Sequence, residues 1–143
     1  MKFLKACVFY PKELNDVSIN KMQEARKKYD SYLFQIKDKY NAELIGLYNR
    51  TAEFHDYRVS KLDFIYNRLI DNQVSLFINS YNENEKYNLV FEGVSEFIVT
   101  GLISDAEDIT LCEIGIVKNV NYIYFHFANG TELEMKFKNV IFL

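Results

Sequence analysis

Long apolar runs are missing from this sequence of 143 residues, as are tryptophan and all but one proline. No segment approaches the roughly 18 consecutive apolar residues that a membrane-spanning helix needs, so we expect no such helix. Residues 4–7 read Leu-Lys-Ala-Cys, which has the outline of a lipobox. Lys5 lies inside it, and no apolar stretch of about 7–15 residues precedes it. We therefore expect no signal peptide and a cytoplasmic protein.

Cysteine is scarce, and the common catalytic motifs are missing. Cys7 and Cys112 match no metal or redox spacing, so we expect two small buried thiols in a reducing cytosol, with a disulfide or a reactive thiol as the alternative. There is no Gly-x-Ser-x-Gly, no phosphate-binding glycine-rich loop, no Cys-x-x-Cys and no His-Glu-x-x-His. These absences favour a non-enzymatic protein without a cofactor or a metal.

Positive charge is also in short supply. The 17 Lys and Arg residues against 20 Asp and Glu residues give a net charge of −3. A duplex-binding protein usually carries a basic face, so we expect no nucleic-acid partner. Acidic residues concentrate between positions 83 and 113, where Lys86 is the only cation. We interpret this segment either as a solvated rim or as a negative surface that attracts a protein partner with a basic surface. The candidate binding residues within it are Glu92, Glu96, Asp105, Glu107 and Asp108.

The length and the apolar content are those of one globular domain spanning 1–143. Hydrophobic residues make up 49% of the chain and charged residues 26%. A chain of about 150 residues buries roughly 70% of its unfolded surface, which is enough to fold without a disulfide or a metal.

A helix-period stripe predicts one long N-terminal helix, preceded by a strand at 2–10 that Pro11 ends. Asp16 can cap the first turn of the helix, and Gly46 and Asn49 mark its end. About 30 residues would make a helix about 45 Å long, so we expect it to bend, to break near 30–31, or to project and pack against a second copy. The apolar stripe consists of Ile19, Met22, Ala25, Tyr29, Leu33, Ile36, Tyr40, Leu44 and Leu47.

Short β-like runs replace the helical pattern from Val59 onward. Because no helical segment separates these runs, they predict antiparallel pairing. We therefore predict an α+β fold: an N-terminal strand and long helix over 1–50, packed on an antiparallel β-meander of about six strands over 51–143, with a partly closed barrel as the alternative. The predicted strands are 59–67, 73–81, 87–98, 109–117, 121–128 and 131–142.

The last hairpin allows its register to be predicted. A two-residue loop at Asn129 and Gly130 would mix polar and apolar residues on each face. A three-residue loop, 128–130, instead puts Gly130 at the left-handed position of a bulged turn and segregates the two faces. The predicted apolar pairs are Phe125–Leu133 and Ile123–Met135, and the predicted polar pairs are His126–Glu132, Tyr124–Glu134 and Tyr122–Lys136.

His55 and Asp56 form the most distinctive polar pair, just before the first predicted meander strand. Such a pair occurs in metal-dependent phosphohydrolases, but these need more histidine ligands than this chain has, because His126 is its only other histidine. Neighbouring residues in an extended chain also point to opposite faces. We interpret His55 and Asp56 as turn residues or, together with Arg58, as part of a partner-binding surface. A metal-dependent hydrolase that uses both residues, with or without His126, is the alternative.

Three short motifs carry a resemblance that covers residues 54–143. They are Phe-His-Asp-x-x-Val at 54–59, the run Tyr-Asn-Leu-Val-Phe-Glu-Gly-Val at 87–94, and Phe-x-x-Gly-x-Glu-Leu at 127–133. Together they resemble a group of small bacterial β-rich domains without an assigned activity. Some small bacterial domains of this general look act as immunity proteins, which bind and block a toxin. The resemblance thus implies a non-enzymatic binding module of immunity or inhibitor type, while a structural protein that self-associates through the long helix is a third hypothesis.

Overall fold

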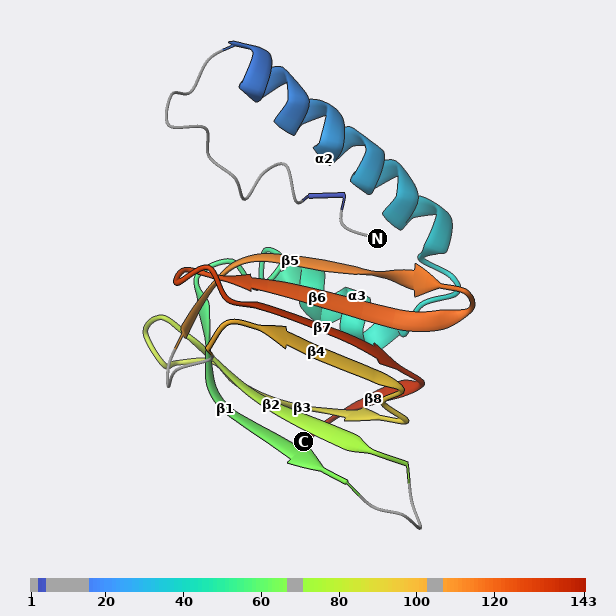
Figure 1. Cartoon of the computed structure of the whole chain (residues 1–143), viewed down its shortest axis with the longest axis vertical. Coiled ribbons are helices and arrows are strands. Elements are labelled where there is room, and N and C mark those ends of the chain that lie inside the picture. The colour runs from blue at the N-terminus through green and yellow to red at the C-terminus, as the bar shows by residue number, and fades with distance from the viewer. Residues whose placement is uncertain (1–2, 5–15, 67–70, 103–106) are drawn as a thin grey trace.

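The computed structural model describes residues 3–4, 16–66, 71–102 and 107–143, and its fold is α+β (Figure 1). Within these residues, helices α2 (Asp16–Ile36) and α3 (Ala42–Arg50) precede an antiparallel sheet of eight strands. Neither helix combines the length and apolar character that crossing a membrane requires. The strands are β1 (Tyr57–Ile65), β2 (Gln73–Ser80), β3 (Lys86–Glu92), β4 (Glu96–Thr100), β5 (Glu107–Val117), β6 (Val120–Phe127), β7 (Glu132–Phe137) and β8 (Asn139–Phe142).

The single long helix of the prediction is two helices. The chain breaks at 37–41 and not near 30–31, because the Asn41 side chain caps α3 by accepting from the Leu44 N–H at 2.9 Å. Tyr40, just before this cap, is buried, and its hydroxyl donates to the Tyr122 carbonyl at 2.9 Å. Of the strand predicted at 2–10, only residues 3–4 are described, and they form a turn; Cys7 lies outside the described residues.

Two predicted strands are each divided by a kink. The run 87–98 becomes β3 and β4, and the run 131–142 becomes β7 and β8. The kinks face each other: Gly93 has a φ of +62°, and the Lys138 N–H donates to the Glu92 carbonyl at 2.9 Å. β3 pairs with β8, and β4 pairs with β7. The two kinked segments, 86–100 and 132–142, therefore run side by side and connect the half of the sheet that contains β3 and β8 with the half that contains β4 and β7.

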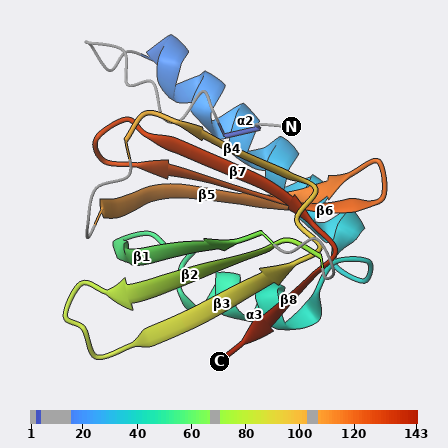
Figure 2. The ribbon, with the colours of Figure 1, turned by 60° about the horizontal axis from the view of Figure 1, so that its bottom comes forward.

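The strand order is β4-β7-β6-β5-β1-β2-β3-β8. The runs β1-β2-β3 and β5-β6-β7 are meanders, as predicted, but β1 pairs with β5 at Arg58 and Val59, which a simple meander does not contain. The sheet is not closed, so the barrel alternative is wrong, and β4 and β8 are its edges. Figure 2 shows one half, β4 to β7, above the other half, β1, β2, β3 and β8, with α3 behind them.

The register predicted for the last hairpin is confirmed at all five pairs. Gly130 has a φ of +86°, and the Phe127 N–H donates to the Thr131 carbonyl across a three-residue loop. The polar face of this hairpin is nevertheless largely covered: Tyr122 and Tyr124 are buried. Glu113, the strand partner of Tyr124, is also fully buried and accepts from the Leu4 N–H at 3.1 Å, so it is not part of a solvated rim.

Helix α2 covers the part of the β5 edge that β1 leaves open. The Tyr29 hydroxyl accepts from the Ile114 N–H at 2.7 Å and lies 3.2 Å from the carbonyl of the same residue. The Tyr32 hydroxyl does the same at Ile116, at 2.7 and 3.0 Å. Two side chains one helical turn apart therefore satisfy backbone groups that a further strand would otherwise pair.

Candidate functional site

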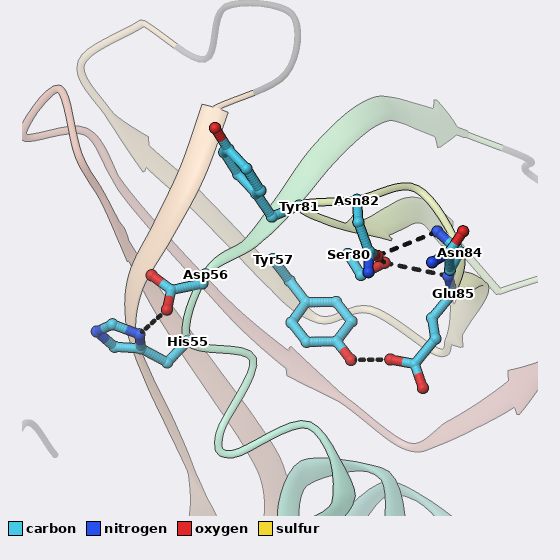
Figure 3. A pocket seen from close by; sticks show the side chains of 8 residues that line it. All are labelled: His55, Asp56, Tyr57, Ser80, Tyr81, Asn82, Asn84 and Glu85. Carbon is cyan, nitrogen blue, oxygen red and sulfur yellow. Dashed lines mark hydrogen bonds and ion pairs between the residues drawn. The ribbon is translucent and has the colours of Figure 1, made fainter.

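A groove of about 540 Å³ lies between the turn that follows α3 and the turn that connects β2 to β3 (Figure 3). We call it the His55 groove. The pairing of Tyr57 with Ser80 in β1 and β2 holds its two walls together. Two of its lining residues are carboxylates and none is a lysine or an arginine. The lining residues are His55, Asp56, Tyr57, Ser80, Tyr81, Asn82, Asn84 and Glu85.

The turn at 51–56 has an unusual backbone. Ala52, Glu53 and Phe54 have φ values of 48°, 64° and 58°, and Asp56 has a φ of 65°. Left-handed backbone costs a non-glycine residue about 1–2 kcal/mol, so this conformation persists only because the surroundings impose it. Residues held in this way cluster at ligand clamps and active sites, which makes the turn a candidate site.

Three anchors impose that backbone. The ring of Phe54 is fully buried against Tyr48 and Phe125. The Thr51 hydroxyl is buried, donates to the Leu47 carbonyl at 2.9 Å, and accepts from the Phe54 N–H at 3.1 Å. Glu53 binds both terminal nitrogens of the Arg26 guanidinium on α2. With these residues fixed, the side chains that follow point outward.

His55 and Asp56 are those outward side chains. Their side chains are 59% and 80% exposed, and His55 Nδ1 lies 3.0 Å from Asp56 Oδ2. The Asp56 N–H donates to the Ile109 carbonyl at 3.3 Å, which fastens the turn to β5. The sequence predicted a turn or a binding role for this pair, and the structure places it at one end of the His55 groove (Figure 3).

The opposite wall is a tight polar turn. The Ser80 hydroxyl donates to the Asn82 side-chain oxygen at 2.7 Å and accepts from the Glu85 N–H at 3.0 Å. Between the walls, the Tyr57 hydroxyl donates to the Glu85 carboxylate. Burial raises the pKa of Tyr57, and the bond to Glu85 raises it further, so this hydroxyl remains a donor at neutral pH.

Tyr81 forms the aromatic surface of the groove. Its side chain is 71% exposed, and the Arg58 guanidinium lies 4.9 Å from the centre of its ring. Arg58 is in turn paired with Asp108, its neighbour across β1 and β5. The structure thus brings two of the predicted binding residues together as a support behind Tyr81.

The remaining acidic candidates lie elsewhere. The Glu92 side chain accepts from Asn139 at 3.3 Å, and Glu96 pairs with Lys136 at 2.9 Å. Asp105 is outside the described residues, and of Glu107 only the backbone in β5 is described. Two strands separate β5 from β3, and two others separate β5 from β4. Spacings of about 4.8 Å put β3, which carries Glu92, and β4, which carries Glu96, each about 14 Å from β5 along the sheet, beyond the screening length of about 8 Å at physiological salt.

The second histidine does not join the first. His126 Nδ1 lies 2.7 Å from the Thr110 hydroxyl, and burial lowers the pKa of His126 although Glu132 opposes that shift. Among the residues that the structure describes, no group of three or more His, Cys, Asp or Glu side chains could hold a metal ion.

Sequence reasoning missed the aromatic part of the groove. Tyr57 and Tyr81 were not among the candidates, because tyrosine is abundant in this chain and carries little positional information, and Glu85 was considered only as part of the acidic segment 83–113. They could have been found from the pairing of β1 with β2. Because Tyr57 pairs with Ser80, the turn before β1 and the turn after β2 lie at the same end of the sheet. A scan against protein-family models finds no match for the chain, and a search of curated proteins finds none either.

Proposed function

We propose that this chain is a cytoplasmic, non-enzymatic protein-binding module whose His55 groove receives a basic side chain of its partner. The observation that carries the proposal is the combination of Asp56, Glu85 and the exposed ring of Tyr81 on two anchored turns. Among the described residues, neither carboxylate forms an ion pair with a lysine or an arginine. An immunity or inhibitor role agrees with this groove and with the sequence resemblance.

The chemistry of the groove favours a cation over other ligands. A guanidinium or ammonium group is attracted to the face of a tyrosine ring, and carboxylates accept its hydrogen bonds. Tyrosine and arginine are also the residues that most often dominate protein interfaces energetically. Arg58 contacts Tyr81 and is neutralised by Asp108, so it orders the ring without making the groove basic.

The hydrolase hypothesis receives no comparable support. His126, the further histidine that it could use, contacts the Thr110 hydroxyl and lies opposite Glu132 in the pairing of β6 with β7. Catalysis by a metal would also need a cluster of ligands, and no three His, Cys, Asp or Glu side chains in the described part of the chain are close enough together to hold a metal ion.

The proposal can be tested by selecting peptides from a random displayed library on the immobilised protein. We expect the selected peptides to contain arginine or lysine and to bind more weakly as salt rises. Replacing Tyr81 by alanine should weaken the binding of a synthetic selected peptide by about tenfold or more, as for an interface hot spot.

The matched control is Tyr66→Ala, because Tyr66 is 67% exposed and lies outside the groove. This variant should bind the peptide as the wild type does. Selected peptides without basic residues, or equal losses in the Tyr81 and Tyr66 variants, would refute the proposal. Asp56→Asn supplies an independent check, since it removes charge from an 80% exposed side chain without disturbing the core.

A further inference from the structure

In the described part of the chain, β4 and β8 are the two edge strands of the sheet, whereas side chains of α2 cover the open part of β5. The Tyr29 and Tyr32 hydroxyls satisfy the open edge of β5. β8 has only four residues, and polar side chains contact its beginning: Asn121 donates to the Lys138 carbonyl at 2.8 Å, and Asn41 donates to the Asn139 side chain at 3.3 Å. An uncovered edge offers every second N–H and C=O to another strand, and proteins usually block such edges.

Strand β4 lacks the strongest blocking devices, and its one charge, Glu96, is at its first position. Its sequence, Glu-Phe-Ile-Val-Thr at 96–100, contains no proline and no lysine, and its pairing with β7 shows no bulge. Ile98 is 43% exposed and Val99 is 37% exposed, so apolar side chains reach solvent on both faces of the strand. Beyond β4 the chain turns toward β7, where the Asn129 and Thr131 side chains both donate to the Leu102 carbonyl.

The sequence of β4 complements itself. Paired antiparallel with a copy of itself about Ile98, it places Phe97 opposite Val99 and Ile98 opposite Ile98. Glu96 then lies opposite Thr100, whose hydroxyl can donate to the carboxylate. Apolar residues meet apolar residues, and a polar pair closes each end. This palindromic pattern suits a two-fold interface, in which the same patch serves both subunits.

We propose that two copies of this chain associate through antiparallel pairing of β4 with β4, with the two-fold axis at Ile98. The pairing continues the sheet across the dimer as β7-β4-β4-β7. This interface is independent of the His55 groove, which lies at the turns 51–56 and 80–85. It also differs from association through the long helix, which the sequence suggested.

A crosslinking experiment tests the register directly. Residues opposite each other in an antiparallel pair have Cα atoms about 4.5–5.5 Å apart, within the range of a disulfide. With Cys7 replaced by serine and Cys112 fully buried, Ile98→Cys should oxidise with copper–phenanthroline to a covalent dimer on a non-reducing gel. Phe34→Cys on α2, where the side chain is 70% exposed, should remain monomeric, as should Leu102→Cys.

Sedimentation equilibrium tests the association without a crosslink. We expect a mass that rises with concentration from 17.0 kDa toward twice that value. Ile98→Lys should weaken the association by about tenfold or more, because it places two like charges opposite each other on the two-fold axis. Phe34→Lys should leave the association unchanged, and circular dichroism should confirm that both variants fold.

Three outcomes would overturn the proposal. The wild type could have the mass of one chain at every concentration. Phe34→Lys, and not Ile98→Lys, could abolish the association, which would place the interface on α2. The Phe34 or Leu102 cysteines could crosslink as readily as the cysteine at 98, which would show random encounters.

Discussion

Single residues in the turn before β1 conflict with their own backbone preferences. Asp56 tolerates a left-handed conformation better than most residues, but Ala52, Glu53 and Phe54 do not. Each of the last two has a contact that compensates: Phe54 is buried in the core, and Glu53 binds Arg26. Contacts with the core and with α2 therefore stabilise the turn, while His55 at its tip remains exposed to solvent.

His126 gives a prediction about pH. Burial lowers its pKa below the ordinary value of 6.5, so below about pH 6.5 the unfolded chain binds more protons at this residue than the folded chain. The contribution of His126 to stability is therefore complete above pH 6.5 and falls as the pH drops through that value toward the folded pKa. His126→Gln should reduce the loss of melting temperature between pH 7 and pH 5. An equally steep loss in the variant, measured by thermal unfolding, would contradict this cause.

At the scale of elements, the contact of α2 with β5 depends on two hydroxyls. Tyr29→Phe leaves the buried N–H and carbonyl of Ile114 without their partner, and each unsatisfied buried group costs about 1–3 kcal/mol. Since two groups are affected, we expect urea unfolding to show a loss of about 2–6 kcal/mol for this variant and a smaller loss for Tyr32→Phe, which is less buried. Tyr66→Phe, in an exposed position, should unfold as the wild type does, and a loss in it as large as that of Tyr29→Phe would refute the explanation.

The elements also show what the sequence could predict. The register of β6 and β7 followed from local information. Gly130 fixes the length of the turn, and the alternation of polar and apolar side chains then determines which residues pair. The break at 37–41 did not, because the apolar stripe continues through Tyr40 on both sides of it. His55 and Asp56 were found as candidates since they stand out locally, whereas Tyr81 and Glu85 join them only through the pairing of β1 with β2.

For the molecule as a whole, the two facing kinks decide how the halves of the sheet meet. Sequence alternation runs through both kinks, so six strands were predicted where eight are present. Nothing local in Arg58 or Leu89 indicates that β1 lies beside β5 or that β3 lies beside β8. Such pairings are decided by the packing of the complete chain.

Gly93 tests the importance of the kink. A methyl group added there would lie 2.6 Å from Lys138 Cδ and 2.9 Å from its Cβ, at a φ of +62°. We expect Gly93→Ala to lower the free energy of unfolding by about 1–3 kcal/mol in urea. The control, Gly46→Ala in α3, should raise it by about 0.5–1 kcal/mol, because alanine is the better helix former. A neutral Gly93→Ala variant would show that the kink tolerates a side chain.

The pairing of β3 with β8 has a consequence for synthesis on the ribosome. Glu92 and Asn139, which face each other in this pair, are separated by 47 positions. At roughly 5–20 residues per second, the ribosome needs about 2–9 s to make the intervening segment. During that interval the nascent β3 has no neighbour on one side, so a chaperone that shields this strand would act on the growing chain and not on the finished protein.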